Sequence, residues 1–179
     1  MSLGARSATI SYTKNTKVYL AGPDGFTPVL AKWHHDVLVP AVAAAGLTPV
    51  RPWGEFVDEF GAALAMVPGP ARTAVFADLD KRVGEANAKR IETSAGILAQ
   101  LDGVDVDSGT ASEIGYGSAL GLYISGVRTD FRLSSDNEGT RVNLQVEYFI
   151  TRTGGRVHAT NEAAIAELAA LVLQKGPAH

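Results

Sequence analysis

The feature that most constrains the fold is an apolar run at residues 95–101, followed by an acidic loop and a helical pattern. The run does not alternate and is bounded by polar residues, which predicts a strand buried on both faces. From Ser108 to Gly121, small residues recur at helical spacing. Strand, loop and helix in this order build parallel α/β sheets, so Asp105, Asp107 and Glu113 are expected at the carboxyl end of a strand, where such sheets bind ligands.

The rest of the chain repeats this alternation. Apolar runs predict strands at residues 17–21, 47–50 and 122–126, and helical patterns predict helices at 30–45, 71–93 and 160–174. Residues 22–25 form a strong turn signal, 51–70 predict a loop with a helical turn or two, and 142–149 are compatible with helix or strand. The alternation predicts a doubly wound, flavodoxin-like α/β fold, with a five-stranded parallel sheet in the order 2-1-3-4-5 and helices on both faces.

In that order the first and third strands are neighbours, so the loops that follow them are expected to face each other. Residues 1–16 are polar and are expected to be a flexible segment, and residues 17–179 are expected to form a single domain. In the helix at 30–45, the side chains of Leu30, Trp33, Val37 and Leu38 are expected to point inward.

Composition excludes several classes of function. The 179 residues carry a formal net charge of −3, so there is no general attraction for nucleic acid or an anionic membrane. No apolar run approaches the ~20 residues of a membrane-spanning helix, and no signal peptide is evident at the start. The chain has no cysteine, which excludes disulfides and thiolate metal sites and suits a cytoplasmic enzyme. The Lys81-Arg82 and Lys89-Arg90 pairs are interpreted as a solvated helix face.

Glu113 has two interpretations. The local pattern from Thr110 to Glu113 favours a capping box, in which Thr110 caps the helix and Glu113 bonds back to the backbone. The loop, however, has more acid than a cap needs, and the small residues around Glu113 leave room for a ligand. The helix N-terminus is expected to favour the ionised form of Glu113, which would suit a nucleophile.

Two segments resemble the nucleoside 2-deoxyribosyltransferase family. They are residues 19–26, Tyr-Leu-Ala-Gly-Pro-Asp-Gly-Phe, and residues 107–117, Asp-x-Gly-Thr-Ala-x-Glu-x-Gly-Tyr-Gly. Residues 128–132 and 142–144 are similar to further segments of that family in the same order, so the resemblance covers about residues 17–149.

This resemblance implies that Glu113 attacks C1′ of a 2′-deoxynucleoside and forms a covalent deoxyribosyl-enzyme, from which a second base takes the sugar with retention. It implies that Tyr19 lies beside the nucleophile and that Asp107 holds a sugar hydroxyl. Asn143 would reach the same sugar from a neighbouring subunit of a homo-oligomer. The remaining candidates for substrate binding are Gly22, Phe26, Asn87 and Trp53. The partners implied are 2′-deoxynucleosides and free nucleobases, with no cofactor.

Ordinary structural roles compete with these assignments. Asp107 could be a solvated loop residue, Tyr19 and Phe26 could belong to the core, and Asn143 could cap a turn. Trp53 could stack on a base or cover the core. No metal site is expected, because His34 and His35 are adjacent on a helix and cannot share a face.

Asn87 departs from the family pattern. Some members carry there an acid that manages the proton of the leaving base, and an amide cannot do so. Asp78, Asp80 and Glu85 are not obvious replacements, so the proton donor and the choice between purine and pyrimidine stay open. Two further functions also stay open: an N-glycosidic hydrolase of nucleosides or their 5′-monophosphates, and a non-catalytic nucleotide-sensing module.

Overall fold

The computed structural model describes residues 14–52 and 54–175. Its centre is a parallel sheet of five strands in the order β2-β1-β3-β4-β5, which confirms the predicted fold class and strand order. The strands are β1 (Lys17–Ala21), β2 (Thr48–Val50), β3 (Gly96–Gln100), β4 (Tyr123–Val127) and β5 (Val157–His158). Strand β5 is not among the predicted strands, because a strand of two residues carries no periodicity that could reveal it.

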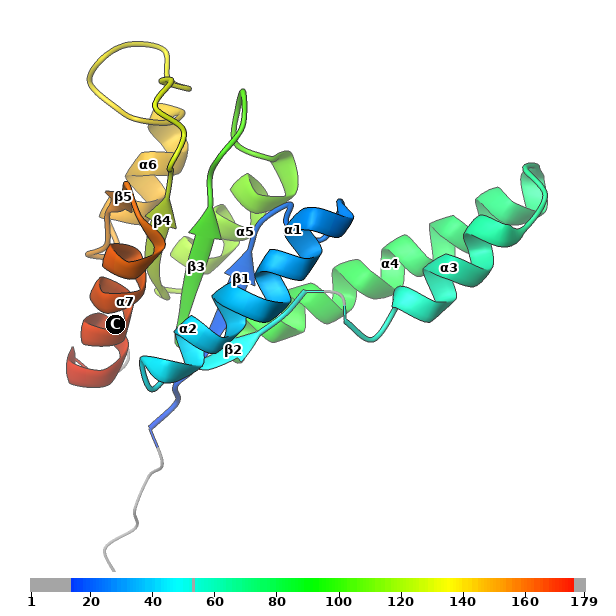
Figure 1. Ribbon diagram of the computed structural model, residues 1–179, viewed down its shortest axis with the longest axis horizontal. Coiled ribbons are helices and arrows are strands. Elements are labelled where there is room, and N and C mark those ends of the chain that lie inside the picture. The colour runs from blue at the N-terminus through cyan, green and yellow to red at the C-terminus, as the bar shows by residue number, and fades with distance from the viewer. Residues whose placement is uncertain (1–13, 53, 176–179) are drawn as a thin grey trace, which may run out of the picture.

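Helices cover both faces of the sheet (Figure 1). One face carries α4 (Pro70–Glu92), α5 (Ser108–Ala119) and α6 (Leu144–Thr151), and the other carries α7 (Asn161–Lys175) and a composite helix described below. Residues 142–149 are therefore mostly helical. The two faces have separate buried clusters: Tyr19, Ile97 and Ile114 belong to one, and Leu20, Leu98 and Leu168 belong to the other. Consecutive residues of a strand point to opposite faces, which explains this division.

The predicted helix at 30–45 consists of α1 (Pro28–Trp33), a π-helical turn η1 (His34–Leu38) and α2 (Val39–Ala44). Pro40 has no N–H and would crowd the carbonyl four residues earlier, and the wider π turn, in which Val39 N–H bonds to His34 O, removes that conflict. Leu38 is buried and Trp33 is partly buried, but Leu30 and Val37 are 40% and 52% exposed. The expectation for these last two was wrong, because His34, Leu38 and Val42, spaced by four residues, form the buried stripe.

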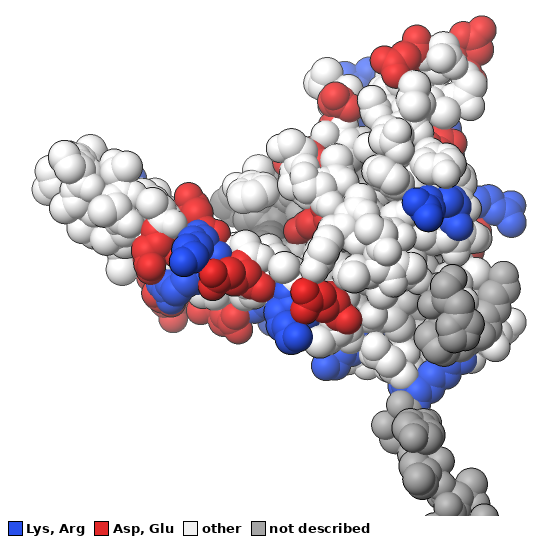
Figure 2. All heavy atoms as spheres, turned by 180° about the vertical axis from the view of Figure 1, so that it is seen from behind, with Lys and Arg blue, Asp and Glu red and all other residues white. Residues whose placement is uncertain are grey.

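Residues 51–70 contain more helix than expected. The helix α3 (Val57–Ala65) pairs with the 23-residue α4, and the two form an arm that projects from the body (Figure 1). The arm has a small core of Phe56, Ala63 and Leu79. In the view of Figure 2, the charged side chains of the arm gather near the body and its far end is mostly free of charge; Leu64 and Val67, at that end, are 61% and 86% exposed.

Polar contacts tie the outer elements to the sheet. Glu167 on α7 accepts hydrogen bonds from Ser125 Oγ on β4 at 2.6 Å and meets His158 Nε2 on β5 at 2.8 Å. Within the segment expected to be flexible, Asn15 bonds to Thr93 O and Thr16 O accepts from Thr48 N, and residues 1–13 lie outside the described part of the chain. No helix of the described residues is long and apolar enough to cross a membrane.

Candidate active site

Glu113 of α5 and Tyr19 of β1 meet on the face of the sheet that α5 covers. Glu113 lies in the second turn of α5, and the buried Tyr19 of β1 donates its hydroxyl to Glu113 Oε1 at 2.5 Å. A Cβ atom on Gly117 would lie 2.3 Å from Ile97 Cδ1, so a glycine is what allows α5 to lie this close to β3. The position of Tyr19 on β1 and the close packing that Gly117 permits together hold Glu113 Oε1 in place.

The ionisation of Glu113 differs from the sequence-based expectation. Burial raises the pKa of Glu113 to about 7, the charge of Asp107 acts in the same direction, and the hydrogen bond from Tyr19 only partly opposes them. The prediction that the helix N-terminus would favour the ionised form is therefore wrong in its net direction, because burial is the largest influence on the pKa of this carboxyl. Burial, and then the charge of Glu113, raise the pKa of Tyr19 far above its usual range, so the phenol stays protonated and donates.

The capping-box interpretation is also wrong. The N-cap of α5 is Asp107, whose Oδ2 accepts from Thr110 N at 2.9 Å and from Thr110 Oγ1 at 3.1 Å. The helix thus begins three residues earlier than the pattern suggested, and Thr110 is a donor inside its first turn. Asp107 caps at least as well as a threonine would, which leaves Glu113 for its contact with Tyr19. Asp107 is therefore not simply a solvated loop residue.

The turn after β1 lies beside the end of β3. A Cβ on Gly22 would be 3.0 Å from Gln100 Cβ, so close packing accounts for this glycine. Asp24 is buried, and its Oδ2 lies 3.4 Å from His34 Nδ1 on η1. Phe26 is 79% exposed, so the alternative that it belongs to the core is wrong, and its side chain is accessible to a ligand.

A second group of residues lies where the loop after β2 meets α4. Asn87 Oδ1 accepts from Arg90 Nη1 at 3.0 Å, and the same nitrogen donates to Pro52 O at 2.7 Å. A cavity of about 240 Å³ adjoins this loop, between Pro52 and Gly54 on one side and His34 and His35 on the other. Trp53 lies outside the described residues.

Asn143 is the N-cap of α6, where its Oδ1 accepts from Gln145 N at 3.0 Å. Its capping role is thus confirmed, but Asn143 also lines a cavity of about 380 Å³ together with Asp105 and Ser134. Asp105 precedes α5 by a few residues, so this cavity lies beside the loop that leads to Glu113.

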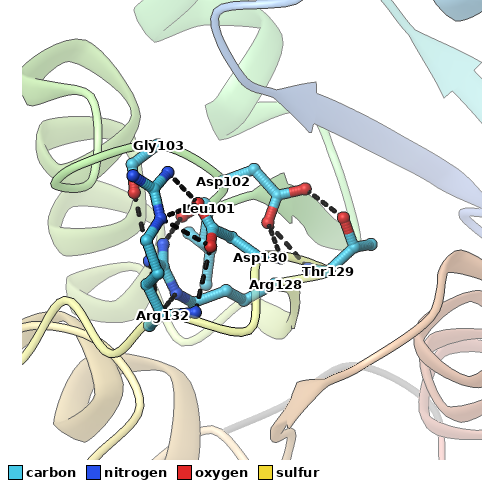
Figure 3. A network of polar contacts seen from close by, with 7 residues as sticks. All are labelled: Leu101, Asp102, Gly103, Arg128, Thr129, Asp130 and Arg132. Atoms are coloured by element: carbon cyan, nitrogen blue, oxygen red, sulfur yellow. Dashed lines mark hydrogen bonds and ion pairs between the residues drawn. The ribbon is translucent and has the colours of Figure 1, made fainter.

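A network around Arg128 holds the loops at this edge of the sheet (Figure 3). Arg128 is 1% exposed and donates from Nη1 to Leu101 O, from Nη2 to Gly103 O and Arg132 O, and from Nε to Arg132 O. Asp102 accepts from Thr129 N and Oγ1 and from Asp130 N. Because the loop fastened in this way runs on to Asp107, the network fixes the entry to α5.

The sequence did not predict the contacts of Arg90, the burial of Arg128 or the Asp24–His34 pair. The interpretation as part of a solvated face is wrong for Arg90, whose side chain is 18% exposed. Residues 128–132 were recognised as similar to a family segment, but nothing in the pattern showed that Arg128 is buried. For Arg90, the spacing of three residues from Asn87 on one helix was the available signal. In the described ranges, no three histidine or acidic side chains are grouped so that they could hold a metal ion.

Comparisons with known proteins agree with the fold. A 2-desoxiribosyltransferase from Leishmania mexicana is 22% identical, with a TM-score of 0.61 over 86% of this chain and 97% of that one. A conserved protein from Enterococcus faecalis V583 is also 22% identical, with a TM-score of 0.60 and the same coverage. A CMP N-glycosidase from Clostridium botulinum is 16% identical, with a TM-score of 0.50 over 85% of this chain and 97% of that one.

Among curated protein sequences, none matches this chain. A sequence model described as nucleoside 2-deoxyribosyltransferase matches residues 18–145, a span that includes β1 and its turn, Glu113, the Arg128 network and Asn143. The chain therefore belongs to the nucleoside 2-deoxyribosyltransferase family.

Proposed function

We propose that this protein transfers 2-deoxyribose between nucleobases through a covalent deoxyribosyl–Glu113 intermediate. The observation that carries the proposal is the pair of Tyr19 and Glu113, in which the phenol donates to Oε1 and Oε2 is available to a substrate. A carboxylate held by one oxygen and removed from water can both stabilise and capture a positively charged sugar carbon.

The reaction has two displacements. Glu113 Oε2 attacks C1′, the C1′–N bond breaks, and its electron pair leaves with the base, which then takes up a proton. A nitrogen of the second base attacks C1′ from the opposite face, the C1′–O bond breaks, and Glu113 is released as a carboxylate while the new nucleoside loses a proton. Two inversions at C1′ give retention.

The surroundings of Glu113 support assignments for the sugar and the base. Both hydrogen bonds that Asp107 makes as a cap end on Oδ2, so Oδ1 can accept a sugar hydroxyl. We assign the base to the side of Asn87 and of the cavity beside Pro52, with Phe26 and Gly22 as further candidate contacts. Trp53 belongs to the same loop in the sequence.

Hydrolysis is the second candidate, in which water replaces the second base on the same intermediate. The chain shares its fold with a CMP N-glycosidase, which acts on a nucleotide. Here the cavity beside Asn143 is lined by Asp105 and Asp136, and these carboxylates would repel a 5′-phosphate. Nucleosides are therefore the proposed substrates for either reaction.

Asn143 bears on the assembly. We expect a homo-oligomer in which Asn143 completes the site of a neighbouring subunit. Two apolar residues of α6 close to Asn143, Leu144 and Tyr148, are 51% and 55% exposed and are available for an interface.

Incubation of the protein with deoxyinosine, with and without adenine, distinguishes the candidates. Release of hypoxanthine that requires adenine and yields deoxyadenosine supports transfer, and equal release without adenine supports hydrolysis. No release would support a sensing module and would contradict both reactions. Inosine should react far more slowly than deoxyinosine, because a 2′-hydroxyl disfavours positive charge at C1′.

The Glu113→Ala variant tests the nucleophile. It should lower the rate by several powers of ten and keep the melting temperature within a few degrees, as expected for a lost nucleophile. Glu138→Ala, at an exposed loop position, is the matched control and should change neither quantity. Substantial base exchange by Glu113→Ala would contradict the covalent mechanism.

A further inference from the structure

A cavity of about 470 Å³ lies beyond the carboxyl ends of β1, β3 and β4, and the proposed chemistry makes no use of it. Pro23 and Asp24 follow β1, Gln100 ends β3, Thr129 follows β4, and Asn161 begins α7. In this strand order β1 and β3 are the neighbours at which the order reverses. Open α/β sheets bind ligands in the crevice at that point, so the position alone makes this cavity a candidate ligand site.

The cavity and the catalytic pair use opposite faces of the sheet. Tyr19 belongs to the buried cluster under α5, whereas Leu98 belongs to the cluster under α7. Gln100 lies two positions after Leu98 on β3, so its side chain points to the same face as that of Leu98. Its Nε2 donates to Asn161 Oδ1 on α7 at 2.7 Å. The cavity is therefore on the α7 side of the sheet, and Glu113 is on the α5 side.

Three polar groups that line the cavity keep hydrogen-bonding capacity. Gln100 is 6% exposed, and in the described part of the chain only its Nε2 is bonded, so Oε1 is an open acceptor. Asn161 uses Oδ1 in that bond, which leaves its Nδ2 as a donor. Asp24 is 7% exposed, its Oδ2 lies 3.4 Å from His34 Nδ1, and no described residue donates to Oδ1. Buried polar groups are normally paired, so an open acceptor on so buried a side chain points to a ligand in the cavity.

The charge of the cavity limits the kind of ligand. Among the described residues that line it there is no lysine or arginine, but there are two carboxylates, Asp24 and Asp102. Asp102 already accepts from Thr129 N, Thr129 Oγ1 and Asp130 N, so it acts as a fixed charge and not as an open acceptor (Figure 3). Two carboxylates without a cation disfavour a phosphate and favour a ligand that presents N–H groups.

The remaining lining is apolar and includes a flat ring. Val29, Leu30 and Trp33 of α1 contribute to it. Tryptophan offers a face on which an aromatic ring can stack. Apolar walls with a few convergent polar groups are the usual composition of small-molecule sites, and the volume of this cavity lies within their range. A flat heterocycle that carries N–H groups fits both parts of the lining.

We infer that this cavity binds a free amino-substituted nucleobase, such as adenine or cytosine. Such a base presents an exocyclic NH₂ group beside a ring nitrogen that accepts a hydrogen bond. The NH₂ group donates to Gln100 Oε1 and Asn161 Nδ2 donates to the ring nitrogen, which is the pairing by which amide side chains read adenine. Asp24 Oδ1 accepts a further N–H, and the ring stacks on Trp33. The choice of a nucleobase among amino heterocycles rests on the proposed function, in which free bases are substrates and products.

The fluorescence of Trp33 measures this binding without turnover. The chain has two tryptophans, so Trp53→Phe leaves Trp33 as the single one. Excitation at the long-wavelength edge of tryptophan absorption avoids absorption by the base. Adenine should quench the emission saturably, because it stacks on the indole. Hypoxanthine, with a carbonyl and a ring N–H in place of the NH₂ group and the acceptor, should bind about tenfold or more weakly. AMP should also bind more weakly than adenine, because Asp24 and Asp102 repel its phosphate.

Variants of the single-tryptophan protein test the assigned contacts. Gln100→Met removes the open acceptor with little change of shape and should weaken adenine binding about tenfold or more. Gln174→Met, at an exposed position of α7, is the matched control. Leu30→Phe fills part of the cavity, should weaken binding several-fold, and serves if Gln100→Met does not fold. Leu64→Phe, on the exposed arm, is its control. Asn87→Ala, on the side assigned to the base in catalysis, should leave the quenching unchanged.

Equal binding of adenine and hypoxanthine, equal affinities of Gln100→Met and Gln174→Met, or no quenching at all would overturn the inference. Loss of quenching in Asn87→Ala would assign the bound base to the catalytic site and would overturn it as well. The measurement needs no transfer of sugar, so it separates the two proposals. Quenching selective for adenine in a protein that transfers no sugar would reject the proposed function and keep this site. Normal transfer without such quenching would reject this site alone.

Discussion

At the scale of single residues, burial of the ionised form of Glu113 destabilises the folded protein. Its carboxylate is largely removed from water and faces the charge of Asp107, and both effects raise its pKa from 4.5 to about 7. The protonated form is therefore the one that the folded state prefers. A carboxyl group whose pKa is higher in the folded than in the unfolded state stabilises the folded protein at low pH. That contribution is lost as the pH rises through the pKa of the folded state.

The first prediction follows from this sign. Glu113→Gln should raise the free energy of unfolding by about 1–3 kcal/mol at pH 8, where Glu113 is ionised, because the neutral amide avoids the penalty of burial. Near pH 4 the two proteins should be almost equally stable, since Glu113 is then mostly protonated in both the folded and unfolded states. Thermal melts across this range measure the difference. Glu138→Gln is the control, and a constant gap at all pH values would contradict the prediction.

Asp107 combines a structural and a proposed functional role, and a second prediction separates them. Asp107→Asn should change stability by less than ~0.5 kcal/mol, because asparagine is an equally good N-cap. It should nevertheless slow sugar transfer strongly, since an amide cannot offer the second carboxylate oxygen to a hydroxyl. The loss of charge should also lower the pKa of Glu113. Kinetics, melts and the titration together check this, and an unimpaired rate would show that Asp107 is only a cap.

At the scale of elements, the position of Glu113 depends on how closely α5 packs on β3. Two glycines of α5 differ in this respect. A Cβ on Gly117 would lie 2.3 Å from Ile97 Cδ1, whereas a Cβ on Gly115 would meet only the ring of Phe149, at 3.6 Å. The first contact is an overlap and the second is ordinary van der Waals contact.

The third prediction uses this contrast. Gly117→Ala should slow transfer by about tenfold or more, because the overlap displaces α5 and separates Glu113 from Tyr19. Adding Ile97→Val removes the overlapping methyl group and should restore most of the loss, so the two changes should not be additive. Gly115→Ala should keep the activity and stabilise the helix by about 0.5–1 kcal/mol. Additive losses in the double variant would contradict this account of the packing.

At the scale of the whole molecule, the question is whether one chain holds a complete site. The apolar side of α7 is used within the subunit, because Ala164, Leu168 and Val172 are buried against the sheet. On α6, Leu144 and Tyr148 are more than half exposed, so this helix keeps apolar surface that an interface could cover. Asn143 lies at its start, beside the cavity that includes Asp105.

The fourth prediction concerns this shared site. Glu113→Ala and Asn143→Ala should each be inactive, but mixing them with exchange of subunits should recover about a quarter of the unaltered activity if the assembly is a dimer. A mixture of either variant with the Glu113→Ala/Asn143→Ala double variant should recover none. A mixture that stays inactive, or a fully active monomer in sedimentation, would place the site within one chain.

Much of the fold followed from local patterns. Strands β1 and β3 and the helices α4 and α7 agree with the predicted segments to within two residues, because each has a clear apolar period and a clear boundary residue. The errors lie where local rules compete. Asp107 and Thr110 could each be the N-cap of α5, and in the structure the N-cap is Asp107. The π turn at His34–Leu38 could not be foreseen from residue spacing.

For this protein the sequence by itself determined the alternation of strands and helices, the sheet order, and a carboxylate at the sheet edge, because these depend on periodicity and on the handedness of parallel connections. Only the tertiary structure decided that Glu113 bonds to Tyr19 from a strand 94 positions away, that its pKa rises instead of falling, and that Arg90 is enclosed. Those properties depend on which groups are brought together and how much water is excluded. Burial and contact between distant residues are products of packing, and no local pattern contains them.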